Sequence, residues 1–90
     1  MNRSMNEEFY LNYLKSFIES KGSTFKELSK LCGFDNSLLT LIFKCRRRIS
    51  IDTAFKLENA LGLDAEKLLL LQLKEEVRIY KLTNYETNAG

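Results

Sequence analysis

The chain has 90 residues, 44% of them hydrophobic, and a net charge of +2 at neutral pH, which together indicate one small domain with a single core. It contains no histidine and only two cysteines, so zinc sites and thiol–histidine catalysis lack their ligands and their base. The absence of proline favours an all-helical fold.

The first predicted helix runs from about residue 6 to Lys21 and ends at Gly22, after an N-terminal tail of residues 1–5. Ser4 and Glu7 have the spacing of a capping box, and Asn6 is an alternative cap. The apolar side chains that follow recur at helical spacing and predict one buried face, made by Tyr10, Leu14, Phe17 and Ile18.

The second predicted helix begins with another capping box, formed by Thr24 and Glu27. Gly33 follows it, where a helix end favours a residue in the left-handed conformation. The inward stripe of this helix is expected to be Leu28, Leu31 and Cys32.

A third helix should follow the turn at Phe34, with Asp35 or Asn36 as its N-cap. Cys45 stands where a glycine would end this helix most easily, and an exposed loop of three arginines, 46–48, comes next. Its inward face is expected to contain Leu39, Ile42 and Phe43.

Ile49 is expected in the core, Ser50 as the cap of a fourth helix, and Gly62 as its end. The inward residues of that helix are expected to be Ala54, Leu57, Ala60 and Leu61. Asp64 should cap a fifth helix. Residues 77–83 are rich in strand-forming types, but the preceding charged residues favour a continued helix there, followed by a flexible tail at 84–90.

Charge is unevenly distributed along the chain. Residues 21–48 contain seven basic and two acidic residues, a balance of +5, so the remainder sums to −3. A local excess of this kind suits a surface that meets phosphate groups, although it also fits a solvated face.

The two cysteines could pair, but Cys32 falls in the last turn of a helix, which favours a buried, reduced thiol. The first residues, MNRSMNEE, are polar and acidic and do not resemble a signal peptide. The leucine run at 68–71 is far shorter than the roughly 20 residues that a membrane span needs. We therefore expect a cytoplasmic protein without a membrane partner.

The stretch from Gly22 to Gln72 resembles the lambda-repressor-like (Xre-type) helix-turn-helix domain. It is most similar to the antidote proteins of toxin–antitoxin addiction modules. The resemblance depends on four short motifs: RRIS at 47–50, DTA at 52–54, ALG at 60–62 and LQ at 71–72. It implies an all-α, five-helix helix-turn-helix domain over residues 6–83.

In that fold the third helix lies in the major groove and the second crosses the DNA backbone. The resemblance thus implies base contacts from Asn36, Ser37, Thr40, Leu41 and Lys44. The implied phosphate contacts come from Lys26, Lys44, Arg46, Arg47 and Arg48, together with backbone amides near Thr24 at the start of the second helix.

The fifth helix has more leucines than one face can bury in a small core. We expect some of them to form a homodimer interface around Leu70, Leu73, Val77 and Tyr80. A twofold dimer would hold two recognition helices about 34 Å apart, one turn of duplex.

These features predict a sequence-specific, double-stranded-DNA-binding transcriptional repressor that binds a palindromic operator. The resemblance further implies autoregulation and a toxin protein as a candidate partner. The alternative is a protein-interaction module of the same fold that uses Phe25, Leu38 and Leu41 and does not bind DNA. No nucleophile–base pair, metal cluster or phosphate-binding glycine loop is visible, so we expect neither an enzyme nor a cofactor or metal.

Overall fold

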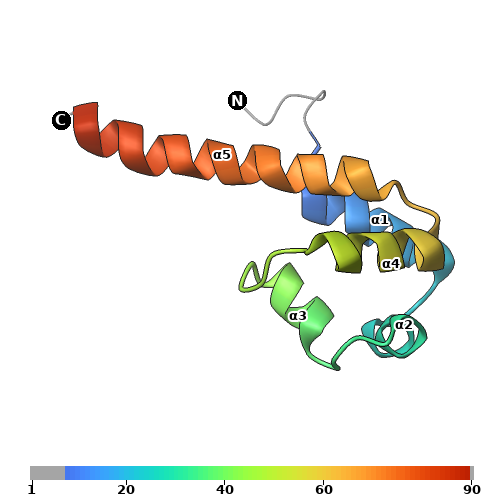
Figure 1. Cartoon of the computed structure of the whole chain (residues 1–90). Coiled ribbons are helices and arrows are strands. Elements are labelled where there is room, and N and C mark those ends of the chain that lie inside the picture. The colour runs from blue at the N-terminus through green and yellow to red at the C-terminus, as the bar shows by residue number, and fades with distance from the viewer. Residues whose placement is uncertain (1–7, 90) are drawn as a thin grey trace.

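A computed structural model describes the backbone of residues 8–89 and the side chains of residues 8–84. The described residues form five α-helices and no strand, which confirms the expected all-α class. The helices are α1 (Tyr10–Lys21), α2 (Phe25–Cys32), α3 (Leu38–Phe43), α4 (Ile51–Leu61) and α5 (Ala65–Ala89). Helix α5 lies across one side of the molecule and projects past the other helices, while α2 and α3 lie on the side far from it (Figure 1).

Helix α1 begins at Tyr10, so the predicted start at about residue 6 was wrong. Its N-cap, Phe9, has an extended backbone and makes no side-chain capping hydrogen bond. Ser4, Asn6 and Glu7, the predicted caps, lie outside the described residues.

Helix α2 has the predicted capping box, in which the Glu27 amide donates to Thr24 Oγ1 and the Thr24 amide donates to Glu27 Oε1. It ends at Gly33, whose φ of 74° confirms the predicted left-handed residue. The expected inward stripe was wrong in one member, because Leu31 is 71% exposed. Positions 25, 28, 29 and 32 face the core at helical spacing, so Ser29 is buried in its place.

Helix α3 is short, and neither Asp35 nor Asn36 caps it. The Asp35 carbonyl accepts from the Leu38 amide and closes one turn before the helix, which moves the N-cap to Ser37. Leu39 and Ile42 are fully buried, as predicted. Phe43 is half-buried, at the edge of the core.

The chain leaves α3 in an unusual conformation at Cys45, which has a φ of 60° although it is not glycine. The amide of Arg46 donates to the Leu41 carbonyl at 2.9 Å, and that of Cys45 donates to the Ile42 carbonyl at 3.0 Å. This pair of hydrogen bonds is the usual helix ending around a left-handed residue, so Cys45 fills the position predicted for a glycine.

Helix α4 begins at the predicted cap, where the Thr53 amide donates to Ser50 Oγ, and ends at Gly62 with a φ of 81°. Ile49 is fully buried, as predicted. Of the expected inward residues on α4, Ala54, Leu57 and Leu61 are buried and Ala60 is half-buried.

Asp64 precedes helix α5 and caps it as predicted, since its Oδ1 accepts from the Lys67 amide at 3.2 Å. It packs on α4 and α1 through its first half. Residues 77–83 are helical, which confirms the prediction over the strand alternative. The helix then continues to Ala89, where the sequence had suggested a loose tail.

Candidate nucleic-acid interface

The polar residues predicted to contact bases lie together at the start of α3. Asn36, Ser37 and Thr40 are all exposed, and Lys44 is exposed at the other end of the helix. The Ser37 side chain makes no capping hydrogen bond, so its hydroxyl is not used to begin the helix. This edge of α3 therefore presents hydroxyl and amide groups to solvent, the donors and acceptors that base edges recognise.

The large apolar residues near this edge are partly covered by the protein. Leu38 and Leu41 are half-buried, and Leu38 packs against the core. Phe25 stacks on Phe43 with ring centroids 5.1 Å apart and an interplanar angle of 22°. The three residues of the interaction-module alternative, Phe25, Leu38 and Leu41, are therefore half-buried rather than fully exposed.

The start of α2 offers fewer backbone donors than the sequence suggested. The amides of Thr24 and Glu27 are already satisfied within the capping box. Only the amides of Phe25 and Lys26 remain from the first turn for an external anion. The Lys26 side chain is exposed beside them.

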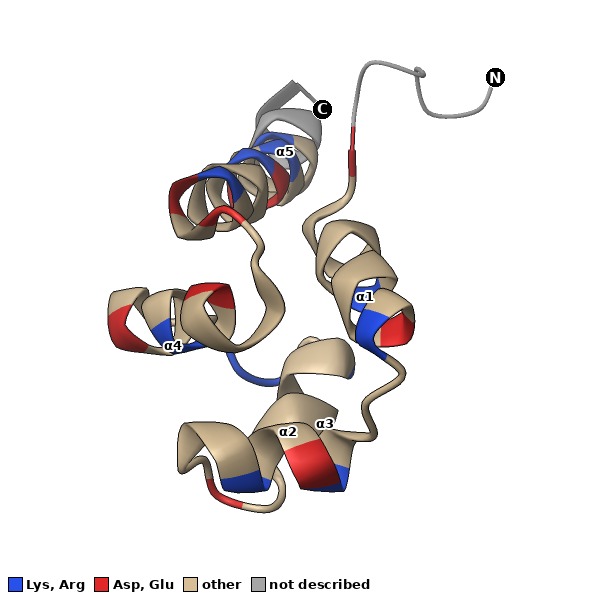
Figure 2. Ribbon diagram, turned by 90° about the vertical axis from the view of Figure 1, so that its right-hand side faces the viewer, with Lys and Arg blue, Asp and Glu red and all other residues tan. Residues whose placement is uncertain are grey.

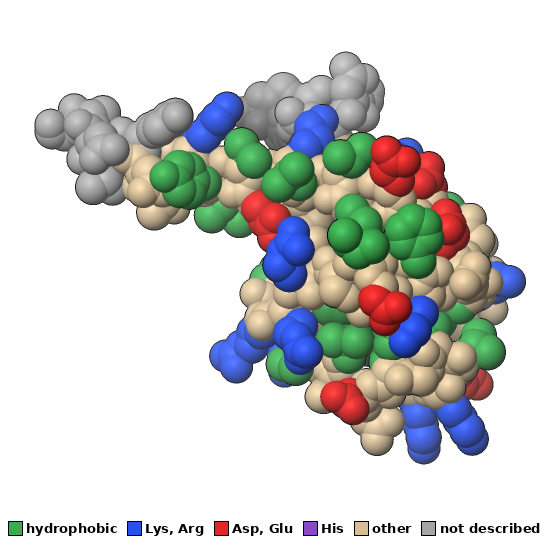
Figure 3. Space-filling model, in the orientation of Figure 1, with side chains coloured by type: hydrophobic (Ala, Val, Ile, Leu, Met, Phe, Trp, Pro, Cys, Tyr) green, Lys and Arg blue, Asp and Glu red, His purple; other side chains and the backbone are tan. Residues whose placement is uncertain are grey.

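Basic residues flank α3 on two sides. Lys and Arg lie on α2 and in the loop between α3 and α4, while α5 carries charges of both signs (Figure 2). On the surface, blue side chains project at two separated places near α2 and the α3–α4 loop (Figure 3). The exposed basic residues in these two elements are Lys26, Lys30, Lys44, Arg46, Arg47 and Arg48.

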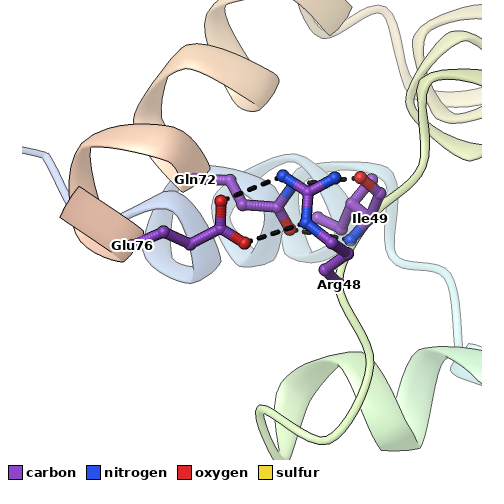
Figure 4. A network of polar contacts seen from close by, with 4 residues as sticks. All are labelled: Arg48, Ile49, Gln72 and Glu76. Carbon is purple, nitrogen blue, oxygen red and sulfur yellow. Dashed lines mark hydrogen bonds and ion pairs between the residues drawn. The ribbon is translucent and has the colours of Figure 1, made fainter. Parts of the chain in front are cut away.

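The third arginine of the loop differs from the other two. Arg48 Nε and Nη2 donate to the two carboxylate oxygens of Glu76 on α5, at 2.9 and 3.0 Å (Figure 4). The hydrogen bonds from Arg48 hold the pKa of the Glu76 carboxyl below its ordinary value. The structure thus holds Arg48 toward α5, while Arg46 and Arg47 remain exposed; Arg47 lines a surface pocket beside Glu76 and Ile79 of α5.

A second contact anchors the same loop. Gln72 on α5 is 1% exposed, and its side-chain amide pairs with both backbone groups of Ile49 (Figure 4). This role of Gln72 was not predicted from the sequence. The available signal was spacing, because Gln72 follows Leu68 by one helical turn and so falls on the buried face of α5.

The predicted dimer residues share one exposed face of α5. Leu70, Leu73, Val77 and Tyr80 are 53%, 50%, 43% and 62% exposed, respectively. A row of hydrophobic side chains along α5 is visible in Figure 3. An uncovered apolar row of this length suits a protein contact.

The two cysteines are free; Cys32 is half-buried and Cys45 is exposed. Within the described residues, no cluster of acidic or cysteine side chains could hold a metal ion. No helix in the same part of the chain combines the length and hydropathy required to cross a membrane.

Comparisons with protein-family models, with curated proteins and with solved structures found no match to this chain.

Proposed function

We propose that this protein is a dimeric, sequence-specific DNA-binding transcriptional repressor that inserts α3 into the major groove. The observation that carries the proposal is the exposed polar edge of α3, bordered by basic side chains from α2 and from the α3–α4 loop. Base recognition needs polar groups on an accessible helix, and its register needs phosphate contacts on both sides of that helix.

The proposal assigns two kinds of contact. Asn36, Ser37 and Thr40 hydrogen-bond to base edges, and the half-buried Leu41 supplies an apolar contact to a thymine methyl. The phosphate contacts come from exposed cations on both sides of α3, namely Lys26, Lys44, Arg46 and Arg47. Arg48 acts by positioning the loop, since its guanidinium is paired with Glu76.

The dimer provides the second recognition helix for a palindromic operator, through the exposed apolar face of α5. Occupation of a promoter then blocks transcription. Autoregulation and neutralisation of a toxin belong to the same proposal, and they are supported by the resemblance of the RRIS, ALG and LQ motifs to those of the antidote proteins.

The test begins with selection of bound duplexes from a random pool, followed by fluorescence anisotropy with the enriched sequence. The double variant Arg46→Ala, Arg47→Ala should bind at least about tenfold more weakly, and its log–log salt slope should fall by about 2 because two phosphate contacts are lost.

The matched control is Lys15→Ala with Lys56→Ala, which removes the same charge from exposed i,i+4 ion pairs on α1 and α4. It should leave affinity nearly unchanged. If both double variants weakened DNA binding equally, the loss of affinity would be due to net charge and not to contacts from Arg46 and Arg47. If no sequence were enriched from the random pool, sequence-specific binding would be refuted.

A further inference from the structure

Four exposed apolar residues on α5 have a spacing that reads the same in both directions. Leu70, Leu73, Val77 and Tyr80 are separated by three, four and three positions, the pattern of a coiled-coil seam. A symmetric row of this kind is complementary to a second copy of itself when the two helices run in opposite directions.

We infer that two copies of this chain pair through antiparallel α5 helices, with the twofold axis near position 75. In this pairing Leu70 packs against the partner's Tyr80, and Leu73 packs against the partner's Val77. This inference deepens the proposed function, since it specifies how the dimer is built.

The next layer outward at each end of the seam is polar. It places Glu66 opposite the partner's Asn84, and both residues continue the same helical face. Asn84 is half-buried, and its Nδ2 donates to the Tyr80 carbonyl at 2.9 Å. The second proton of that amide is available to the Glu66 carboxylate, which closes the seam with a hydrogen bond.

The position of α3 decides the direction of pairing. Helix α5 lies on one side of the molecule and α3 on the opposite side (Figure 1). A twofold axis perpendicular to α5 makes the helices antiparallel and keeps both α3 helices on the same side, where one duplex can meet them. A parallel pair has its axis along α5 and turns the two α3 helices to opposite sides. This step rests on the proposed function.

The antiparallel pairing also covers a second apolar area. Helix α4 exposes Ile51 (68%) and Phe55 (47%), and hydrophobic side chains lie over α4 next to the row on α5 (Figure 3). The C-terminal half of α5 projects beyond the body. When the helices run in opposite directions, the projecting half of each passes along the partner's α4 and covers this area. In a parallel pair the projecting halves meet only one another.

Charges along the seam predict that dimerisation depends on salt in opposite ways for antiparallel and parallel pairing of α5. In the antiparallel pair Lys74 lies close to the partner's Lys74, an exposed repulsion that salt screens, so the dimer tightens as salt rises. A parallel pair sets Glu76 beside the partner's Lys81, so salt would weaken it. DNA binding weakens with salt in either case.

The first experiment measures self-association by analytical ultracentrifugation without DNA. Val77→Arg should weaken the dimer at least tenfold, because it places a charge within the seam. The matched control is Leu82→Arg, on another face of α5, where exposure is 47% against 43% for Val77. Circular dichroism checks that both variants remain helical. A wild-type chain that stays monomeric at millimolar concentration overturns the inference, as does equal weakening by both variants.

The second experiment determines direction by spin-label distances in a Cys32→Ala, Cys45→Gly background. Labels introduced by Lys81→Cys should lie about 15 Å further apart along the helix axis than labels introduced by Lys74→Cys, because each residue adds about 1.5 Å and position 81 is five residues further from the twofold axis than position 74. Equal separations at both positions would show parallel pairing and overturn the inference. Antiparallel distances in a protein that binds no DNA would support the pairing and refute the proposed repressor function. Parallel distances in a protein that does bind DNA would refute the pairing and leave the proposed function standing.

Discussion

The side-chain amide of Gln72 forms two hydrogen bonds with the backbone of Ile49. Its Oε1 accepts from the Ile49 amide at 2.7 Å, and its Nε2 donates to the Ile49 carbonyl at 2.9 Å. Both residues are buried, so each polar group loses water on folding and is satisfied by the other. This pair fixes the loop between α3 and α4 to α5, and it thereby links the proposed phosphate contacts to the proposed dimer helix.

Replacement of Gln72 by leucine should lower the free energy of unfolding by about 2 to 3 kcal/mol, because it leaves the amide and carbonyl of Ile49 buried without partners. Urea denaturation measures the change. Lys74→Ala, an exposed substitution on the same helix, is the control and should stay within about 0.5 kcal/mol of the wild type. Equal losses in the two variants would show that the Ile49 contact contributes nothing specific.

The ion pair between Arg48 and Glu76 should make stability depend on pH. The pKa of Glu76 lies below its ordinary 4.5 in the folded protein, so the contribution is complete above about pH 4.5 and is lost as pH falls through the folded value. Because both side chains are partly exposed, Glu76→Gln should cost only about 0.5 to 1 kcal/mol at pH 7.

Chemical denaturation at a series of pH values tests this expectation. The curves for the wild type and Glu76→Gln should converge as the pH falls through the lowered folded pKa of Glu76, where the carboxyl becomes protonated. A gap that stays constant from pH 7 to pH 3 would exclude the ion pair as its cause.

Ser29 is predicted to reduce stability. Its hydroxyl is buried in α2, and it has no hydrogen-bond partner among the described residues. Ser29→Ala should therefore raise the free energy of unfolding by about 1 kcal/mol or more, since it removes an unsatisfied polar group. Ser16→Ala is the control: the Ser16 hydroxyl donates to the Tyr13 carbonyl at 2.8 Å, and the change in helix propensity is the same. Thermal unfolding should show a gain for Ser29→Ala that clearly exceeds any gain for Ser16→Ala.

The protein should be more stable with glycine at position 45 than with alanine. Its φ of 60° costs an L-residue about 1 to 2 kcal/mol, whereas glycine adopts this conformation freely. Alanine keeps the strain, and both variants remove the thiol from the pocket that Cys45 lines with Tyr10, so the comparison isolates the backbone. A higher melting temperature for Cys45→Gly than for Cys45→Ala is the expected result; the opposite order would show that the left-handed conformation is not strained.

Much of the fold could be predicted from the sequence because its signals are local. The capping box at Thr24 joins groups three residues apart, and Gly33 and Gly62 end their helices through their own backbone freedom. Position 45 was identified as a glycine-like site for the same reason. Such features depend on neighbours along the chain, so they are visible before any tertiary contact is known.

Two of the predictions that failed involved the choice between adjacent positions on a short helix. Leu31 was expected inside, yet the buried face of α2 is centred on Leu28 and Ser29, because α2 meets α3 and α4 there. Hydropathy favoured leucine over serine, but the direction of the neighbouring helices determined which side chain was enclosed. The N-cap of α3 shifted similarly, when a turn from Asp35 to Leu38 took the place of a side-chain cap.

The sequence by itself determined the all-helical class, most helix ends, and the presence of polar and basic residues around α3. Only the tertiary structure decided that Arg48 pairs with Glu76, while Arg46 and Arg47 do not pair with it, and that Gln72 holds Ile49. Those contacts join residues 28 and 23 positions apart. No periodicity within one helix encodes such a pairing, because it depends on how α5 packs against the rest of the chain.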